Sequence, residues 1–213
     1  MSSESINNTS QHRLNNTWVV WYHNPSDNNW DIKSYENVYE INNLMDYCKF
    51  QNSRHHLPSL TESMFFIMRK VNEYEYIYPM WEDVNNKSGG CWSFKISSNS
   101  VEQVWDILSN YLIGENIGNN FNNSMKINGI SFSPKKGFSI VKIWNNDAND
   151  TEILNLLNLE LGDYLNLKES LYKSHVENIS KDQKKKERFL QKKKIYTQKN
   201  WNKKNSYWKK NKY

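Results

Sequence analysis

The chain has 213 residues, which is enough for one domain with a sizeable core. No apolar run approaches the roughly 20 residues of a membrane span, and the polar start has no signal-peptide pattern, so we expect no membrane association. Cys48 and Cys91 are too few for a disulfide framework and too isolated for a zinc site. We expect reduced thiols in a cytoplasmic protein, with the nucleus as the alternative compartment.

Positive charge is concentrated at the end of the chain. Residues 181–213 hold 13 Lys and one Arg against one Asp and one Glu, a net charge of +12, whereas the whole chain carries +5. The preceding 180 residues therefore carry −7. We divide the chain into a lead of residues 1–12 that we expect to be disordered, a domain of residues 13–180 and a basic, low-complexity tail of residues 181–213, to which we assign no fold.

The first half of the domain predicts strands around one helix. Residues 17–23 (TWVVWYH) are rich in β-branched and aromatic side chains, which favours a strand. The turn sequence NPSDNN follows, and we expect a second strand over residues 30–35. Apolar residues then recur at helical spacing, which predicts an amphipathic helix over residues 38–49. Residues 63–70 (SMFFIMRK) predict a third strand.

The second half alternates strands and helices. Residues 91–96 (CWSFKI) alternate in polarity and predict a half-buried strand. Ser100 and Gln103 form a capping-box pattern before an apolar stripe that ends at Gly114, which predicts a helix. The turn PKKG joins two strands, KINGISFS and FSIVKIW, in a predicted hairpin. A third helix is indicated by apolar residues at helical spacing: Ile153, Leu156, Leu157 and Leu161, closed by Gly162. Strands that mostly follow one another favour the α+β class, an antiparallel sheet with helices on one face.

Two tryptophans stand at loop edges, Trp30 after NPSDNN and Trp81 in PMWED. An exposed indole is unfavourable unless something covers it. Two indoles can sandwich a planar base, which is worth roughly 1–3 kcal/mol, and a cationic base adds about 0.5–2 kcal/mol. Glu82 can accept two N–H bonds from a guanine edge, and Lys135 and Lys136 in the PKKG turn can meet phosphates. This set suits a cationic, donor-rich base such as N7-methylated guanine.

Each of these features also has an ordinary structural explanation. Trp81 can be a packing residue of the core, Glu82 and Asp83 a solvated acidic pair, and the two lysines plain surface charge. Chemistry alone therefore leaves nucleotide binding as one alternative. No catalytic motif occurs, and the pair His55 and His56 lacks further ligands at metal spacing. We expect a protein that is not an enzyme and needs no metal or cofactor.

The whole set of motifs resembles the eukaryotic translation initiation factor 4E family, whose members bind the 7-methylguanosine cap of mRNA. The matching segments follow the family order and span about residues 12–175: HRLNNTWVVWYH, NNW, PMWEDVNNKSGGCW, VWDILSNYLIGE, IVKIW and YKSH. The family implies a curved antiparallel sheet of about eight strands, with three long helices on its convex face and the cap site in its concave face. We expect the protein to act as a monomer.

The resemblance carries roles to individual residues by position. It implies that Trp30 and Trp81 stack on the methylated base, that Glu82 accepts from guanine N1 and N2, and that the Trp81 backbone N–H meets guanine O6. Trp144 is implied to pack on the N7-methyl group.

Phosphate binding is expected to be rearranged. It falls near Lys135, with Lys136 as a neighbouring substitute, because two positions that are usually basic are Gly137 and Ile140 here. Lys142 shares a strand face with Trp144 by parity, so we include it in the phosphate set.

The family also binds a partner helix with a Tyr-x-x-x-x-Leu-hydrophobic motif on its convex face. Val38 keeps an apolar side chain there, whereas Asn42, Asp106 and Asn110 are polar at the other three positions. Losing an anchoring Trp can cost several kcal/mol, roughly 2–4. We therefore expect weak or altered binding of the scaffold protein or of an inhibitory binding protein.

These observations predict recognition of capped mRNA in translation initiation. One alternative is a cap-binding repressor that does not engage the scaffold. Another is a general single-strand RNA binder that uses the tail, where basic runs alternate with aromatic residues. Those aromatic residues are Phe189, Tyr196, Trp201 and Trp208.

Overall fold

A computed structural model describes residues 12–210, with side chains as far as Trp201, so the predicted lead lies almost entirely outside the described residues. Eight strands form one antiparallel sheet in the order β2-β1-β3-β6-β7-β5-β8, with β4 paired to β3. The strands are β1 Arg13–His23, β2 Tyr35–Asn43, β3 Met64–Asn72, β4 Glu75–Tyr76, β5 Gly90–Ser97, β6 Ile127–Lys135, β7 Phe138–Asn145 and β8 Leu171–Ser174. The predicted α+β class is confirmed.

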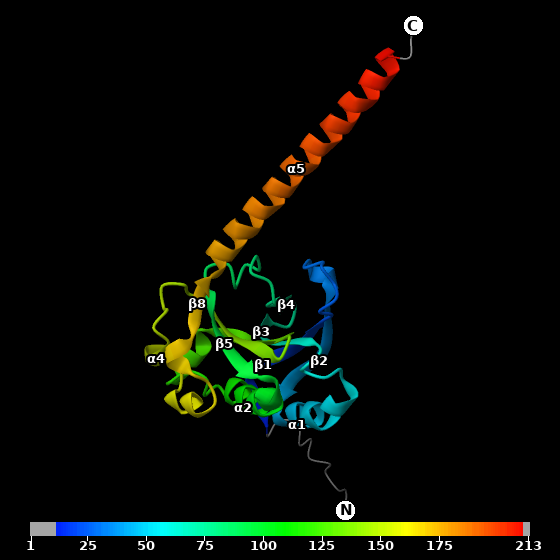
Figure 1. Cartoon of the computed structure of the whole chain (residues 1–213). Helices are drawn as coiled ribbons and strands as arrows, with labels where there is room; N and C mark the ends of the chain where they lie inside the picture. The colour runs from blue at the N-terminus through cyan, green and yellow to red at the C-terminus, as the bar shows by residue number, and fades with distance from the viewer. Residues whose placement is uncertain (1–11, 211–213) are drawn as a thin grey trace, which may run out of the picture. The chain divides into compact units, whose positions relative to one another are not determined.

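Five α-helices accompany the sheet in the described part of the chain. They are α1 Leu44–Ser53, α2 Val101–Ile113, α3 Phe121–Met125, α4 Ile153–Leu156 and α5 His175–Lys210. Figure 1 shows α1 and α2 together on one side of the sheet, which we name the helix face. The loops over residues 24–34 and 77–89 lie on the other side, which we name the loop face.

Each face of the sheet carries its own apolar cluster, because side chains alternate along a strand. On β1, Trp18 and Val20 belong to the main core of the helix face, and Val19 and Trp21 to a smaller cluster on the loop face. β1 is therefore apolar on both sides, which accounts for its unbroken run TWVVWYH. The smaller cluster forms the base on which the two loops lie.

The sequence predictions for residues 30–49 are wrong in their boundaries. Residues 30–35 do not form a strand, because a 3-10 turn at Ile32–Ser34 is capped by the Asp31 side chain. β2 then continues to Asn43, whose side chain caps α1 by accepting from the Asp46 N–H. The spacing that resembled a helix lies on an edge strand, and Val38 is the extra residue of a bulge opposite Val20 and Trp21.

The third predicted helix is only one turn long. Leu157 leaves helical geometry, with φ −86° and ψ 156°, because it pairs with Gly118 in an isolated antiparallel bridge. A separate 3-10 turn, Leu159–Asp163, follows under an Asn158 cap. The helix predicted after Ser100 is present as α2, although Ser100 makes no side-chain capping bond.

The basic tail forms most of α5, a helix of 36 residues. We assigned it no fold, yet residues 175–210 contain neither Gly nor Pro and are rich in the good helix formers Lys, Gln, Glu and Arg. The described residues divide into two compact units, with the division between Val176 and Glu177.

Candidate functional site

Asp83 fixes the conformation of the loop of residues 77–89. From the sequence, Glu82 and Asp83 could have been a solvated acidic pair. Asp83 accepts from the Tyr78 N–H through Oδ2 at 3.0 Å and from the Asn85 N–H through Oδ1 at 2.8 Å. Both oxygens are thus engaged with the backbone. Asp83 therefore has a structural role in the loop.

A buried amide fixes the same loop to the sheet. Asn86 donates through Nδ2 to the carbonyls of Tyr78 at 2.8 Å and Met80 at 2.9 Å. Its Oδ1 accepts from Asn128 Nδ2 of β6 at 2.9 Å. Since a buried amide without partners would be costly, this network favours one loop conformation.

Two glycines end the loop at a crowded junction of strands. A Cβ atom on Gly89 would collide with the carbonyl of Asn145, and one on Gly90 would collide with the Tyr172 hydroxyl. The Gly90 N–H donates to Asn145 Oδ1 at 2.9 Å, and the Tyr172 hydroxyl donates to the same oxygen at 2.9 Å. Close backbone approach therefore requires the glycine pair that follows Trp81 in the sequence.

Trp81 and Glu82 project from this fixed loop. Trp81 is half-buried and packs against the smaller cluster of the loop face. Glu82 is exposed and makes no hydrogen bond or ion pair with any residue that the structure describes. Its charge acts on Tyr35, whose hydroxyl pKa is raised by burial and further by Glu82. Glu82 is therefore an available carboxylate close to Tyr35.

Trp30 lies in the other loop and stacks on a histidine. The Trp30 and His23 ring centroids are 4.2 Å apart and their planes differ by 5°. His23 is fully buried at the end of β1, and its Nε2 lies 3.0 Å from the Asn29 carbonyl oxygen. Trp30 remains 50% exposed. The indole thus has one supported face and much of its surface free.

Two ring contacts and the charge of Glu82 relate the two loops. The His23 ring lies 5.0 Å from the Tyr35 ring, and Tyr35 is the residue on which the Glu82 charge acts. The structure therefore brings Trp30, Trp81 and Glu82 to the same face. His23 and Tyr35 were missed by the sequence reasoning, since only the pairing of β1 with β2 reveals their proximity.

Trp144 lies in the sheet below the two loops and is only 2% exposed. Its Nε1 donates to Ser131 Oγ at 3.0 Å, and its ring lies 4.8 Å from the ring of His175. Burial, together with the nearby Lys142, lowers the pKa of His175 to about 4. Trp144 thus lies in the part of the sheet beneath the two loops, which we name the floor. Its contact with a ligand requires more exposure than this structure gives it.

Two lysines flank this floor. Lys142 lies two residues before Trp144 on β7, and its charge acts on both His175 and Cys91. Lys173 is the cross-strand partner of Cys91 and acts on the same thiol. Lys142 therefore lies on the expected face. Lys173 was missed because its place depends on the register of β8 against β5.

Lys135 and Lys136 lie at the exposed turn between β6 and β7, where Gly137 adopts a φ of 82°. Six positions along β7 separate Phe138 from Trp144, which is roughly 20 Å of strand. These two lysines are therefore more distant from the floor than Lys142 is.

Comparison with known proteins decides the family. Residues 13–190 match the family model described as eukaryotic initiation factor 4E. The chain belongs to the eukaryotic initiation factor 4E family. Factor 4E-1 of Schizosaccharomyces pombe is 25% identical over 172 residues, which cover 78% of this chain and 75% of the relative. Factor 4E of Saccharomyces cerevisiae is 26% identical over 166 residues, which cover 72% of this chain and 71% of the relative.

Solved structures of initiation factor 4E proteins share the fold. One is C. elegans eIF4E-3 in complex with the 4E-binding protein Mextli and a cap analog, with a TM-score of 0.62 and 23% identity over 79% of this chain and 95% of that one. Another is Ascaris suum eIF4E-3 in complex with m7G cap, with a TM-score of 0.59 and 22% identity over 77% and 91%.

The surface that the sequence predicts as a partner-helix site carries a polar seam between α1 and α2. Glu102, Asp106 and Asn110 follow one another at four-residue spacing along α2, so they share one side of the helix. Across from them stand Arg54, Gln51 and Tyr47.

The contacts of this seam run along its whole length. Tyr47 donates its hydroxyl to Asn110 Oδ1 at 2.8 Å, and Gln51 Nε2 donates to Asp106 Oδ1 at 3.4 Å. Arg54 pairs with Glu102. Two of the polar residues expected on the partner surface, Asp106 and Asn110, are therefore engaged within the protein. Asn42 accepts from Thr17 Oγ1 at 3.0 Å, and Val38 is half-buried against the main core.

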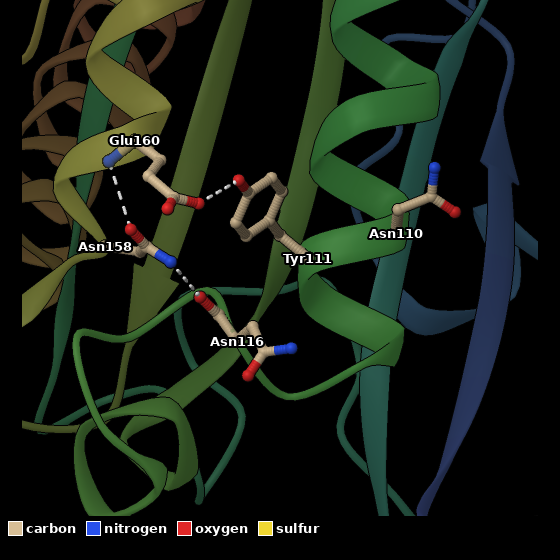
Figure 2. A pocket seen from close by; sticks show the side chains of 5 residues that line it. All are labelled: Asn110, Tyr111, Asn116, Asn158 and Glu160. Carbon is tan, nitrogen blue, oxygen red and sulfur yellow. Dashed lines mark hydrogen bonds between the residues drawn. The ribbon is translucent and has the colours of Figure 1, made fainter.

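A polar hollow adjoins the end of α2. It has a volume of about 310 Å³ and is lined by Asn110, Tyr111, Asn116, Asn158 and Glu160 (Figure 2). Tyr111 donates to Glu160 Oε2 at 2.7 Å, and Asn158 Nδ2 donates to the Asn116 carbonyl at 3.2 Å. None of the residues expected to bind the cap lines this hollow.

No helix within residues 12–210 is both long enough and apolar enough to span a bilayer. No group of three or more His, Cys, Asp or Glu side chains within the same range is arranged to hold a metal ion.

Proposed function

We propose that this initiation factor 4E family member binds the 7-methylguanosine cap of mRNA and acts in translation initiation. One observation carries the proposal: Trp30, Trp81 and an available carboxylate, Glu82, gather on one face of the sheet. Family membership supports it, as do the related eIF4E-3 structures that hold a cap analog or m7G cap.

Each side chain has a physical role in this proposal. Trp30 and Trp81 stack on the two faces of the methylated guanine, at roughly 1–3 kcal/mol per aromatic contact. The positive charge of the base adds about 0.5–2 kcal/mol through cation–π attraction. Glu82 accepts from guanine N1 and N2, and the charge of the carboxylate strengthens both bonds. The backbone N–H of Trp81 meets guanine O6.

The phosphates would follow the lysines of the loop face. Lys142 lies nearest to the floor residue Trp144, and we add Lys173, because its cross-strand partner Cys91 is also the cross-strand partner of Trp144. Lys135 and Lys136, at the turn that precedes β7, would meet the more distant phosphates or the following nucleotide. Trp144 contributes an apolar floor below the N7-methyl group.

Quenching of tryptophan fluorescence tests the proposal. We expect 7-methyl-GTP to quench the full chain at far lower concentration than GTP does. Trp30→Ala, Trp81→Ala and Glu82→Gln should each weaken binding by tenfold or more, on the order of 1.4 kcal/mol. Phe121→Ala, at an exposed site on α3, should bind as the wild type does. Equal responses to the two nucleotides would overturn the proposal.

A second candidate is a cap-binding repressor that does not engage the scaffold. The polar seam of α1 and α2 favours it, because a partner helix with apolar anchors would have to break paired polar groups there. Addition of the protein to a cap-dependent translation extract separates the two candidates: an initiation factor restores synthesis in a depleted extract, and a repressor lowers it.

A further inference from the structure

The surface of α5 carries a pattern that the cap site does not explain. Within its described part, Phe189, Tyr196 and Trp201 are 67%, 68% and 64% exposed. Exposed aromatic side chains in such density indicate a surface that binds a partner.

Lysines are interleaved with Phe189 and Tyr196 on the same side of the helix. Residues three or four apart are neighbours on a helix surface. Lys193 therefore lies beside Phe189, Leu190 and Tyr196, and Lys186 lies beside Phe189 and Leu190. No ion pair engages Lys186 or Lys193 among the residues described, whereas Lys181 pairs with Glu177.

This interleaving distinguishes between two kinds of anionic partner. A helix that lies in a membrane surface needs a continuous apolar side, with its lysines on the opposite side. Here Lys186 and Lys193 lie within the apolar side. Single-stranded nucleic acid instead offers bases that stack on aromatic rings and phosphates that meet lysines, in alternation. The pattern fits the second partner.

We propose that α5 is a second RNA-binding element, which contacts single-stranded RNA without a requirement for a cap. The aromatic–lysine face, defined as Lys186, Phe189, Leu190, Lys193 and Tyr196, stacks on bases and neutralises phosphates. The helix is about 54 Å long at 1.5 Å per residue, so its length suits several nucleotides. Its charge complements RNA, since residues 181–213 carry +12.

Fluorescence anisotropy with an uncapped 20-nucleotide RNA tests this proposal in the full chain. We expect binding that weakens steeply between about 50 and 200 mM salt. Lys186→Gln with Lys193→Gln should lower the slope of log K against log salt by about 1.4, which corresponds to two lost phosphate contacts at about 0.7 each. Phe189→Ala with Tyr196→Ala should weaken binding at least about fivefold and keep the slope.

A charge-matched control tests the face itself. Lys184→Gln with Lys199→Gln removes the same charge from another side of α5 and should weaken binding less. Equal losses in the two double variants, or no binding of the uncapped RNA by the wild type, would overturn the proposal. Binding of phosphatidylserine vesicles in place of RNA would also overturn it. The affinity of the same variants for 7-methyl-GTP should be unchanged, so this test is independent of the cap-binding proposal.

Discussion

The imidazole of His23 and the indole of Trp30 are stacked in parallel, 4.2 Å apart. The buried histidine at the end of a strand thus supports a tryptophan that belongs to a loop. The support is a ring contact between residues seven apart in sequence, and it fixes the plane in which Trp30 presents its free surface.

We predict that His23→Ala weakens cap binding although it leaves Trp30 in place. An aromatic pair contributes about 0.5–1.5 kcal/mol beyond area burial, so the affinity for 7-methyl-GTP should fall about two- to twelvefold. His23→Phe restores a ring and should recover most of the affinity. Fluorescence titration measures both variants. An alanine variant that binds as tightly as the wild type would show that the stack does not position Trp30.

Substitution of the neighbouring acids Glu82 and Asp83 should affect different properties, cap binding for Glu82 and stability for Asp83. Glu82→Gln should keep the thermal stability and weaken cap binding about tenfold, because a neutral acceptor forms weaker bonds than a carboxylate does. Asp83→Ala should lower the free energy of unfolding by about 1–2 kcal/mol, because two backbone N–H groups lose their acceptor. Thermal denaturation and nucleotide titration of the pair would contradict this division if both variants lost stability equally.

The polar seam should disfavour the scaffold motif. We expect a peptide with the Tyr-x-x-x-x-Leu-hydrophobic motif to bind more weakly than in the nanomolar range. Asp106→Leu with Asn110→Leu should tighten binding, because it provides apolar contacts at two positions that are polar in this chain. Asn122→Leu, at an exposed site on α3, is the matched control. Calorimetric titration checks all three, and nanomolar binding by the wild type would contradict the role assigned to the seam.

Acid should destabilise the domain through His175. Its pKa is lowered from 6.5 to about 4 in the folded state, mainly by burial. The unfolded chain therefore binds a proton that the folded chain refuses between these values, and stability falls as the pH falls through that window. The free energy of unfolding should fall by roughly 3 kcal/mol across the whole window, at about 1.4 kcal/mol per pKa unit.

Chemical denaturation at pH 7.5 and pH 5 measures the effect. His175→Phe retains a ring against Trp144 and removes the titrating group, so its stability should change less between the two pH values than that of the wild type. The same change in both proteins would show that groups other than His175 account for the acid response.

Strands with strong local signals were predictable. β1, β3 and β5 contain dense β-branched or aromatic residues, and the turn at Gly137 marks the β6–β7 hairpin. β2 was not predictable, because its apolar residues fall by chance at helical spacing and only pairing with β1 decides its conformation. The prediction that Leu157 is helical failed for the same reason, since its bridge partner Gly118 is distant in sequence.

The candidate site divides in the same way. Trp30, Trp81 and Glu82 stand in recognisable motifs beside turn residues, so the sequence alone singles them out. His23, Tyr35 and Lys173 have no local signal, because their relation to the site depends on strand register and ring geometry. The burial of Trp144 likewise depends on tertiary packing, which includes its ring contact with His175 at the start of α5.

The two tryptophan loops are built with unequal rigidity. The loop of Trp81 is fastened by Asp83, by the buried Asn86 and by two glycines wedged among strands. The loop of Trp30 is held by short local bonds, such as the Asn29 N–H to Asp27 Oδ1, and by two contacts with His23, the ring stack and the approach of Nε2 to the Asn29 carbonyl. A base that binds between the two indoles would thus meet a Trp81 whose loop is already ordered. The conformational entropy lost on binding would come almost entirely from the loop of Trp30.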